Sequence, residues 1–439
     1  MVIQLPENVE KIINTLEAAG FEAYAVGGCV RDSLLGRIPN DWDITTSAKP
    51  EETKALFKNT FDTGIKHGTI SVLLDHVVYE VTTYRIDGEY EDSRHPKSVV
   101  FTTLLSEDLR RRDFTINAMA YNPRAGLVDL YEGQEDIKRK VIRCVGNAEE
   151  RFGEDALRIL RAIRFGAQLG YEIDSDTSKA IKELAPTLLN ISAERIQVEL
   201  VKMLTSDHPE YIRKAYELGI TKVLLPEFDR MMETEQNNPH HCYSVGEHTI
   251  KVLENIKNNR VLRLAALLHD IAKPVTKRTD KEGIDHFNGH PEKSAEIAKA
   301  FFAKYRFDND TRDRVCRLVA FHDWTIGLNR KKFRHAIHRI GEEAFPDIFE
   351  LNRADLLGQS EYKKEEKMEL LCELQAEYAE IQRLGQCTSL KTLAVTGRDL
   401  IEAGFKPGPE LGEKLNYLLE KVLDNPEINN KETLLDMLK

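Results

Sequence analysis

The segments Tyr24-Ala-Val-Gly-Gly-Cys-Val-Arg-Asp-Ser-Leu-Leu-Gly36 and Asn40-Asp-Trp-Asp-Ile44 decide the N-terminal fold. They predict a short apolar strand that runs into Gly27-Gly28, then a helix, then an acidic strand. Glycines at a strand-to-helix turn let backbone N–H groups face a phosphate. Residues two apart on a strand point the same way, so Asp41 and Asp43 can share divalent cations, and Mg²⁺ prefers such oxygen ligands. The combination indicates metal-assisted phosphoryl or nucleotidyl transfer.

A third acidic residue belongs to another predicted strand. The branched and aromatic residues of 77–84 favour a strand, and Glu80 interrupts its apolar character. Glu80 can complete a group of three carboxylates, or it can be an outward-facing strand residue. The predicted strands cover residues 24–26, 42–46, 69–74 and 77–84, and apolar spacing over 9–16 predicts a helix before them.

From about residue 107 the apolar spacing becomes helical and largely remains so to the end. The chain therefore predicts an α+β fold, in which a small head with a mixed sheet and helices precedes an all-α neck, body and tail. At 439 residues, about two to four domains are expected. The predicted boundaries are 1–138 for the head, 139–235 for the neck and the start of the body, 236–360 for a further helical domain, and 361–439 for the C-terminal body and tail.

Composition limits the class of protein. Hydrophobic residues make up 41% of the chain, but no run of about 18 apolar residues predicts a membrane span. The first residues lack a basic region followed by an apolar stretch, so we expect a soluble, cytoplasmic protein. Six cysteines without a Cys-x-x-Cys pair predict reduced thiols. The net charge of −11 disfavours a general affinity for nucleic-acid backbones but allows a local basic RNA site.

Two charged segments follow the head. Residues 110–120, Arg-Arg-Arg-Asp-Phe-Thr-Ile-Asn-Ala-Met-Ala, begin with an arginine cluster and are predicted to continue into a helix. These guanidinium groups can bind phosphates, although three consecutive arginines are usually solvated charge. In 149–165, a helical pattern places Asp155 and Arg158 three residues apart on one face. An ordinary intrahelical ion pair is the alternative for these two.

Five motifs occur in one order within residues 20–225. They are Gly27-Gly28…Arg31-Asp32…Asp41-x-Asp43, Arg111-Arg-Asp-Phe-Thr-Ile-Asn-Ala-Met119, Gly133…Arg143…Gly146, Glu154-Asp-x-x-Arg158 and Ser192-Ala-Glu-Arg-Ile196. The series resembles the motifs of class II tRNA nucleotidyltransferases, which comprise the CCA-adding enzymes and bacterial poly(A) polymerases. The resemblance implies that the head is a polymerase-β-like nucleotidyltransferase domain.

The resemblance also implies residue roles. Asp41, Asp43 and Glu80 match the catalytic acids that bind two metals, for which Mg²⁺ is expected. Arg111 and Asp113 match the pair that recognises the ribose. The residues expected to bind the nucleotide are Gly27, Gly28, Arg31, Arg111, Asp113, Asn117, Asp155, Arg158, Arg161 and Arg164. The loop 87–96 resembles the flexible loop associated with the switch from C to A addition, with a mobile surface hairpin as the alternative.

In this family, the Glu-Asp-x-x-Arg helix acts as a protein template for the incoming base, which maps onto Asp155 and Arg158. Hydrogen-bond chemistry supports that role, because a carboxylate only accepts and a guanidinium only donates. Cytosine and adenine each offer an amino donor beside a ring-nitrogen acceptor, whereas uracil and guanine present the reverse. The pair therefore suits CTP and ATP, and mismatched buried groups cost on the order of 1–3 kcal/mol each.

A second candidate site lies in the middle of the chain. The apolar helical run 265–273 contains adjacent imidazole and carboxylate groups, which are good ligands for transition metals. Four histidines in this spacing, together with two acids, predict a metal site. The pattern resembles the HD phosphohydrolase superfamily, in which a divalent ion activates water. The implied ligands are His248, His269, Asp270 and Asp355, while His290 and His322 would assist a second metal or the substrate phosphate.

In tRNA nucleotidyltransferases with such a domain, here 236–360, the resemblance implies phosphatase and 2′,3′-cyclic phosphodiesterase activity with Mg²⁺, Mn²⁺, Ni²⁺ or Co²⁺. His240-His241 could take part but is better explained as linker. Segment 395–412 resembles the part of the family that grips the tRNA elbow, with a turn at Gly404 and Gly408, although an ordinary helical hairpin is as good an interpretation. Residues 329–335 are a second basic candidate for RNA contact.

The sequence thus predicts addition of CMP and AMP, from CTP and ATP, to the 3′ end of tRNA without a nucleic-acid template. An A-adding enzyme and a poly(A) polymerase share the motifs and remain alternatives. An HD phosphohydrolase whose head only binds RNA is the alternative of another class. The oligomeric state is left open.

Overall fold

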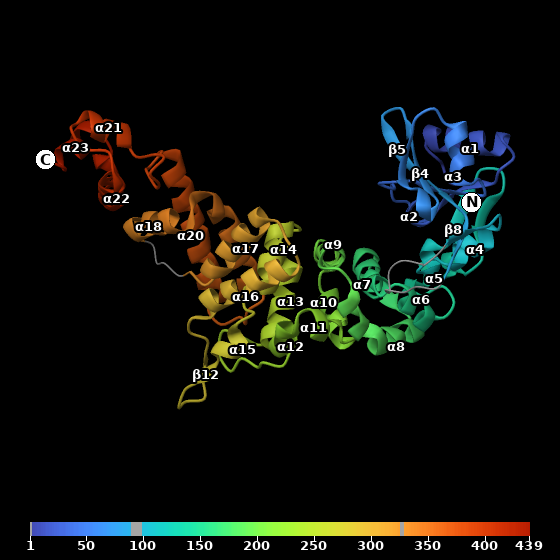
Figure 1. Cartoon of the computed structure of the whole chain (residues 1–439). Coiled ribbons are helices and arrows are strands. Elements are labelled where there is room, and N and C mark those ends of the chain that lie inside the picture. The colour runs from blue at the N-terminus through green and yellow to red at the C-terminus, as the bar shows by residue number, and fades with distance from the viewer. Residues whose placement is uncertain (1, 89–98, 325–328) are drawn as a thin grey trace. The chain divides into compact units, whose positions relative to one another are not determined.

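Alternating apolar residues near the N-terminus build a seven-stranded mixed sheet (Figure 1). Its strand order is β3-β4-β5-β2-β1-β8-β9. Within this sheet β2 and β5 are parallel neighbours, and the other described neighbours are antiparallel. The strands are β1 (Ala23–Val26), β2 (Asp43–Thr46), β3 (Thr60–Gly64), β4 (Thr69–Leu74), β5 (Val77–Thr83), β8 (Met119–Asn122) and β9 (Gly126–Asp129). The predicted mixed-sheet head is confirmed.

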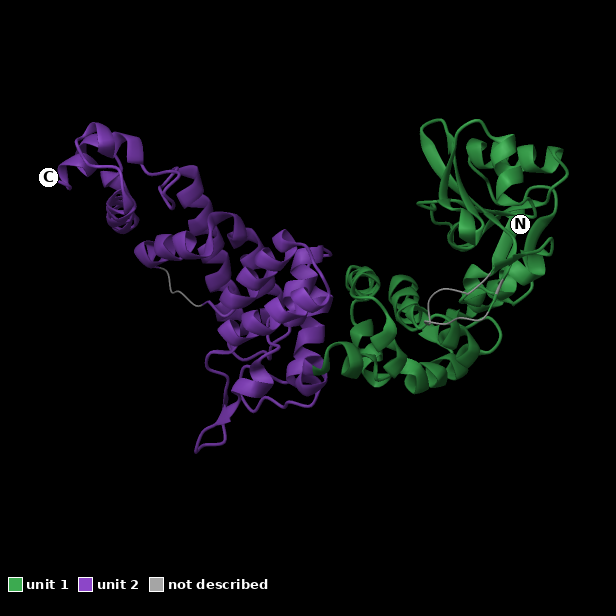
Figure 2. Ribbon diagram, in the orientation of Figure 1, with its two compact units in different colours: residues 1–226 green, residues 227–439 purple. Residues whose placement is uncertain are grey.

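The computed structural model describes residues 2–88, 99–324 and 329–439. Two units make up the chain, Met1–Pro226 and Glu227–Lys439 (Figure 2). The first contains the sheet and the helices around it, and the second is almost entirely helical. The finer four-part division stays a prediction.

The two faces of the sheet differ in character. Helices α1 (Glu7–Ala18), α2 (Gly28–Leu34) and α3 (Pro50–Leu56) belong to this part of the chain. The predicted apolar stripe of α1 packs on one face, against Ile44 and Val81 among others. Because strand residues alternate, Asp43 and Glu80 point to the opposite face. Part of that face is covered by α4 (Leu105–Arg110), whose Leu109 clusters with Val26 of β1.

The prediction that 110–120 continues into a helix is wrong, whereas the largely helical character expected from about residue 107 is confirmed beyond strands β8 and β9. Thr115–Asn117 forms a single 3₁₀ turn, and Met119–Asn122 is strand β8, which pairs with β1 and β9. All four residues of β8 are buried, so its apolar run shows no alternation that would distinguish it from a buried helix. Strand β3 was also missed, and its central residues are exposed at the sheet edge.

Helices follow the sheet in unit 1. They are α5 (Gly133–Arg139), α6 (Ala148–Glu154), α7 (Leu157–Leu169), α8 (Ser175–Leu184), α9 (Ala193–Leu204), α10 (Tyr211–Glu217) and α11 (Ile220–Leu224). The helix predicted across 149–165 is broken at Asp155, which has an extended backbone (φ −140°, ψ 103°). Its Oδ1 accepts the N–H of Leu157 at 3.0 Å and so caps α7, as short acidic side chains often do. The expected shared helical face of Asp155 and Arg158 is therefore wrong.

The predicted loop 87–96 falls mostly outside the described residues, which resume at Val99. Strand β6 (Arg85–Asp87) enters it, and β7 (Val99–Phe101) pairs antiparallel with β6 where the description resumes. Its role in C and A addition stays a prediction.

Unit 2 brings its helices together around a polar centre. They include α13 (Val245–Asn255), α14 (Arg260–Leu268), α16 (His290–Lys304), α17 (Asn309–Phe321), α18 (Arg330–Ile340), α19 (Phe345–Leu357) and α20 (Lys364–Arg383). The C-terminal helices α21 (Gly397–Glu402), α22 (Pro409–Asp424) and α23 (Lys431–Asp436) share a small apolar core. Gly404 has φ +97° and forms the predicted turn between α21 and α22. In the described parts of the chain, we find no helix with the length and hydropathy needed to span a membrane.

Candidate functional sites

Three carboxylates occupy adjoining positions of the head sheet. Asp43 is the register partner of Glu80 in the parallel pair β2–β5, and both lie on the face opposite the apolar core. Asp41 precedes Asp43 by two residues. Burial raises the pKa of Asp43 to about 6, as do the charges of Asp41 and Glu80, against the opposing effect of Arg112. Acids that hinder one another's ionisation fit a divalent cation.

The glycine turn lies at the end of β1, directly before α2. Gly27 has φ +86°, and a Cβ there would lie 3.0 Å from a terminal nitrogen of Arg112. Glycine is therefore favoured here for two reasons: it adopts the left-handed backbone without strain, and it leaves room for the Arg112 guanidinium group. From α2, Arg31 donates to Asn117 Oδ1 at 2.6 Å and pairs with Asp32 at 2.8 Å. These contacts fix Arg31 beside the turn.

A cavity of about 270 Å³ lies between the segment after α4 and helices α7 and α9. It is lined by Arg111, Arg112, Asp113, Asp155, Leu157, Arg158, Arg161 and Arg195. Asp113 pairs with Arg161 at 2.6 Å. Although burial alone would raise the pKa of Asp113, Arg161 and Arg158 lower it to about 2, so this carboxylate stays ionised. Five of the ten predicted nucleotide-binding residues meet at this cavity.

Asp155 and Arg158 both line the cavity but do not pair with each other. Asp155 Oδ2 lies 2.7 Å from a terminal nitrogen of Arg195, and its Oδ1 lies 3.3 Å from the other. Arg158 donates to the carbonyls of Arg151 and Arg111, each at 3.0 Å, and pairs with Glu154. The protein thus fixes both groups before a nucleotide arrives.

Arg164 lies apart from this cavity. Its Nε is 2.7 Å from Glu199 Oε2, and its guanidinium lies 3.9 Å from the centre of the Phe165 ring. Burial lowers the pKa of Arg164 to about 10. The guanidinium groups of Arg31 and Arg161 also lie over Phe165, at 5.1 and 5.2 Å. The three arginines therefore gather positive charge around Phe165, and Arg161 among them also lines the nucleotide cavity.

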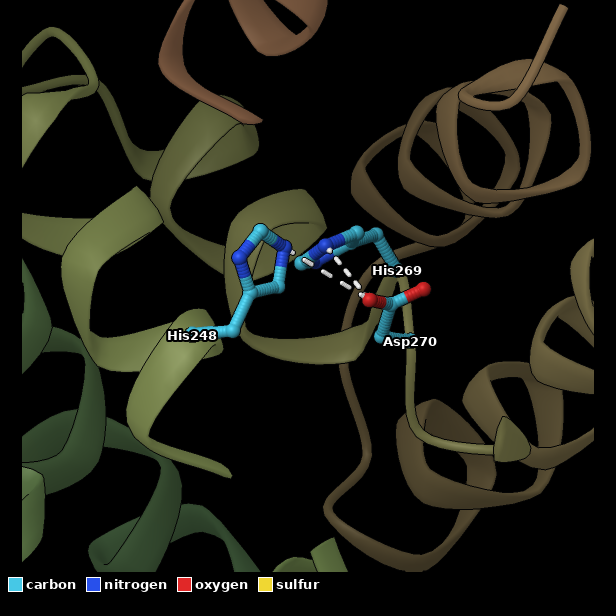
Figure 3. A group of neighbouring side chains, drawn as sticks. All are labelled: His248, His269 and Asp270. Atoms are coloured by element: carbon cyan, nitrogen blue, oxygen red, sulfur yellow. Dashed lines mark ion pairs between the residues drawn. The ribbon is translucent and has the colours of Figure 1, made fainter. Parts of the chain in front are cut away.

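All six residues predicted for the second site come together in unit 2. Figure 3 shows His248 of α13 and His269, at the end of α14, both facing Asp270. The remaining three are His290 at the start of α16, His322 at the end of α17 and Asp355 of α19. Both His248 and His269 are fully buried, and Asp270 is 1% exposed.

Each histidine of this cluster is oriented in the same way. The Nδ1 atoms of His248, His269, His290 and His322 lie 3.1, 2.7, 2.8 and 2.7 Å from backbone carbonyl oxygens. A carbonyl can only accept, so Nδ1 carries a hydrogen, and in the neutral ring Nε2 then has a lone pair that faces the centre. Ring N–H groups held in this way are typical of histidines that bind metals.

Asp270 joins two sets of these nitrogens. Its Oδ2 lies 3.3 Å from His269 Nε2 and 3.6 Å from His248 Nε2, while its Oδ1 lies 3.2 Å from His290 Nε2 and 3.4 Å from His322 Nε2. Asp270 therefore belongs to two groups of three possible ligands, one with His248 and His269 and one with His290 and His322. In each group the ligand atoms lie close enough together to hold a metal ion.

The centre of the cluster has unsatisfied polar atoms. Within the described residues, His269 Nε2 and both oxygens of Asp270 are buried without a hydrogen bond, although Lys273 Nζ makes an ion pair with Oδ2 at 2.7 Å. The Nε2 atoms of His290 and His322 lie 3.1 Å apart, so two lone pairs face each other. These residues fit one or two divalent cations.

A cavity of about 300 Å³ opens onto the cluster. Besides four of the six predicted residues, its walls include Asn238, His241, Lys273, His286, Phe287 and Gln359. The ring of His241 packs edge-on against His248, with centroids 5.2 Å apart. His241 therefore belongs to the cavity wall, and its interpretation as a linker residue is wrong.

Comparison with known proteins identifies the family. Family models match residues 23–143 ("Poly A polymerase head domain"), 170–232 ("Probable RNA and SrmB-binding site of polymerase A"), 240–327 ("HD domain") and 285–438 (tRNA nucleotidyltransferase domain 2). A CCA-adding enzyme of Leuconostoc mesenteroides is 35% identical over 99% of this chain and 96% of its own length. One from Lactobacillus helveticus is 36% identical over 96% and 94%. The chain belongs to the CCA-adding enzyme family. It is a nucleotidyltransferase.

Solved members of the CCA-adding enzyme family share the fold. The Bacillus stearothermophilus CCA-adding enzyme in complex with CTP has a TM-score of 0.73 and 30% identity, covering 98% of this chain and 95% of its own. The Thermotoga maritima CCA-adding enzyme complexed with tRNA-CCA has a TM-score of 0.61 and 22% identity, covering 99% and 96%, and shows the fold alone. The expected α+β architecture agrees with both.

Several residues of this CCA-adding enzyme family member were missed as site components. In the head they are Asp108, Arg112 and Arg195, and beside the histidine cluster they are Lys273 and Gln359. Asp108 precedes Arg111 and Arg112 by three and four residues, a spacing that signals contact in a helix. No local signal pairs Arg195 with Asp155, because 40 residues separate them.

Proposed function

We propose that this enzyme adds CMP and AMP, from CTP and ATP, to the 3′ end of tRNA without a nucleic-acid template. The observation that carries the proposal is the register pairing of Asp43 with Glu80 beside the Gly27 turn. The relatives named CCA-adding enzymes support the product, and the Bacillus stearothermophilus enzyme in complex with CTP supports the nucleotide. The family model for tRNA nucleotidyltransferase domain 2 supports the RNA substrate.

Asp41, Asp43 and Glu80 would hold two Mg²⁺ ions, which activate the 3′ hydroxyl group and neutralise the departing pyrophosphate when bound. The Gly27 N–H is already bonded to the Met119 carbonyl oxygen, so the backbone N–H groups of the following residues, at the start of α2, would face the triphosphate. Arg112 lies against Gly27 and lowers the pKa of Asp43, so its positive charge faces both the triphosphate and the acids. The ionised Asp113 keeps Arg161 at the edge of the nucleotide cavity.

Asp155 and Arg158 would select the base from fixed positions. Of the five N–H donors of a guanidinium, Arg158 gives three to Arg151, Glu154 and Arg111 and keeps two for a ring nitrogen. Arg195 and the Leu157 N–H orient the Asp155 carboxylate, which retains accepting capacity for an amino group. Groups held in advance lose little entropy on binding, which favours discrimination.

The test incubates tRNA that ends before CCA, or after CC, with labelled CTP and ATP. We expect growth by three nucleotides on the first substrate and by one on the second. Growth only of the CC-ended substrate indicates an A-adding enzyme, and a long ladder of A residues indicates a poly(A) polymerase. Absence of any addition overturns the proposal.

Basic residues of unit 2 are candidates for holding the RNA. Helix α18 and the end of α17 line a cavity of about 310 Å³ with Phe321, Trp324, Lys332, His335 and Arg339 among its walls. Aromatic rings beside cations suit an unstacked base and its phosphate. The expected phosphate contact at the Gly404 turn belongs to the same proposal. Reversing the charge of Lys332 should weaken tRNA binding, and the loss of affinity should be largest at low salt concentration.

A second activity is favoured by the histidine cluster. We propose that it holds a divalent metal and hydrolyses phosphate esters, including 2′,3′-cyclic phosphates at damaged tRNA ends. His248, His269, Asp270 and Asp355 would hold the first ion, with His290, His322 and the second oxygen of Asp270 placed for another. The bound metal supplies an activated water nucleophile. Lys273, buried beside Asp270, offers a cation to the substrate phosphate.

Hydrolysis of nitrophenyl phosphate and 2′,3′-cyclic AMP tests this second activity. Purified protein is assayed with Mg²⁺, Mn²⁺, Ni²⁺ and Co²⁺ in turn, and His269→Ala serves as the matched inactive control. We expect turnover with at least one ion and none in the variant. Failure with all four ions argues for a domain without catalysis.

A further inference from the structure

Asp108 is a fully buried carboxylate in the last turn of α4, and it accepts hydrogen bonds from three other side chains. Its Oδ1 accepts two hydrogen bonds from Arg111, from Nε at 3.0 Å and a terminal nitrogen at 2.7 Å. Its Oδ2 accepts from Arg112 at 3.3 Å and from the Thr45 hydroxyl group at 3.1 Å. A buried carboxylate is stable only when its charge and lone pairs are satisfied in this way.

The two arginines reach different parts of the head. Arg111 lines the nucleotide cavity, and its carbonyl oxygen accepts a hydrogen bond from Arg158 at 3.0 Å. Arg112 also lines the cavity, lies 3.0 Å from the position of a Cβ on Gly27, and acts electrostatically on Asp43. One carboxylate thus orients two cations, of which one lies beside Arg158 and the other beside the Gly27 turn.

Thr45 connects the same carboxylate to the acidic strand. It lies two residues after Asp43 on β2, so both side chains project from one face of the sheet. Its hydroxyl group also lies 3.2 Å from the carbonyl oxygen of Thr82, which is two residues after Glu80 on β5. Any shift of Asp108 is therefore transmitted to the strands that carry the catalytic acids.

We propose that Asp108 is a positioning residue for nucleotidyl transfer, which sets Arg111 and Arg112 at the nucleotide and ties them through Thr45 to the acidic strand. The inference rests on the proposed nucleotide addition and names a residue that does not touch substrate itself. Burial acts to raise the pKa of Asp108, but Arg111 and Arg112 hold that pKa below its ordinary value, which favours the ionised carboxylate.

Asparagine at this position has the same shape as aspartate but cannot accept hydrogen bonds from both arginines through two oxygens. An amide has one accepting oxygen and an NH₂ group that only donates. If the oxygen faces Arg111, the NH₂ group faces the N–H of Arg112 and leaves it without an acceptor or counter-charge. We therefore expect Asp108→Asn to misplace one arginine, which weakens nucleotide binding beyond any loss of folded protein.

The experiment measures KM for CTP and kcat on tRNA that lacks CCA, together with Tm. Glu350→Gln is the matched control, because Glu350 is a buried carboxylate that forks an arginine, Arg353, but lies in unit 2. We expect Asp108→Asn to raise KM for CTP by about tenfold. Glu350→Gln should change KM by less than about twofold, whatever its Tm.

Thr45 provides an independent pair of variants. Thr45→Val removes the hydroxyl donor and should raise KM for CTP by a smaller factor, whereas Thr45→Ser keeps the donor and should restore it. A folded Asp108→Asn enzyme with the wild-type KM overturns the proposal. If that variant does not fold, an unchanged KM in Thr45→Val overturns it instead. Wild-type protein that adds no CMP refutes the proposed function, which is a separate result.

Discussion

The acids of the head and the histidine cluster of unit 2 are two ways of preparing a protein for divalent metals. The head offers carboxylate oxygens alone, and the side chains of Asp41, Asp43 and Glu80 are open to solvent, although surrounding protein atoms partly desolvate Asp43. The cluster offers four imidazole nitrogens and two carboxylates, and its central members are buried. Oxygen ligands suit Mg²⁺, whereas imidazole ligands suit later transition metals such as Ni²⁺.

The difference also lies in how each site is built. Two neighbouring strands create the head site, because parallel register puts Asp43 beside Glu80. The cluster needs five helices, and a backbone carbonyl orients each imidazole ring. An open carboxylate site can exchange its ions with each nucleotide. A closed site with its ring N–H groups already fixed is suited to a resident metal.

The largest effect should appear when one variant of each site is assayed for both activities. Asp41→Ala removes an oxygen ligand from the head and should lower CMP addition by at least about a hundredfold while phosphate-ester hydrolysis is unchanged. His269→Ala removes a nitrogen ligand from the cluster and should do the opposite. Both activities are measured on the same preparations.

Loss of both activities in either variant would contradict two separate sites. Circular dichroism of each variant serves as the folding control. Loss of hydrolysis in Asp41→Ala with native spectra would mean that the head itself carries the hydrolytic chemistry.

A smaller effect, on nucleotide selectivity, should show that base choice and metal binding depend on different residues of the nucleotidyltransferase site. Arg158→Ala removes the donor to the ring nitrogen, so misincorporation of UTP and GTP relative to CTP and ATP should rise by about tenfold. The Mg²⁺ dependence of the reaction should not change. Arg158→Lys keeps the charge without the planar fork and should recover little selectivity. Unchanged ratios among the four nucleotides would refute the template role.

The sequence predicted the contents of both sites better than their local structure. The period-two spacing of Asp41 and Asp43, and the isolated Glu80, indicated one acidic face before any fold was known. The histidines were found as a set because their order and spacing, together with two acids, resemble the HD pattern, and the structure brings all of them together.

What sequence reasoning could not provide depends on contacts between distant segments. Asp155 was placed inside a helix because its neighbours are good helix formers, yet capping of α7 and the pairing with Arg195 break the helix there. Strand β8 was read as helix because a fully buried strand has no alternating pattern. Contacts with distant segments determine the secondary structure at Asp155 and at β8, and the spacing of neighbouring residues does not reveal such contacts.

A tenfold effect is expected from a residue that orients a metal ligand of the cluster. Gln359 Nε2 donates to Asp355 Oδ2 at 2.6 Å, and Lys367 Nζ donates to Gln359 Oε1 at 2.7 Å. The other oxygen of Asp355 is thereby turned to His248, 2.8 Å away. Gln359→Ala should weaken Mn²⁺ binding to metal-free protein by about tenfold, measured by calorimetry. The exposed Gln375→Ala is the control, and equal affinities in the two variants would contradict the orienting role.

The smallest effect concerns thermal stability. Removing the charge of Asp43 in the head should raise Tm, whereas most substitutions of functional residues would be expected to leave Tm unchanged or lower it. Folding raises the pKa of Asp43 to about 6, above its unfolded value near 4, so the folded protein binds this proton more tightly. The cost of holding the charge is fully present above about pH 6 and fades as the pH falls towards 4. In metal-free buffer at pH 7.5, Asp43→Asn should therefore raise Tm, by about 2–4 °C because solvent screens part of the repulsion. The difference should vanish at pH 4, and Mg²⁺ should stabilise the wild type more than the variant. A lower Tm of the variant at pH 7.5 would mean that burial and the neighbouring acids do not penalise the Asp43 charge, which removes the physical argument for a cation there.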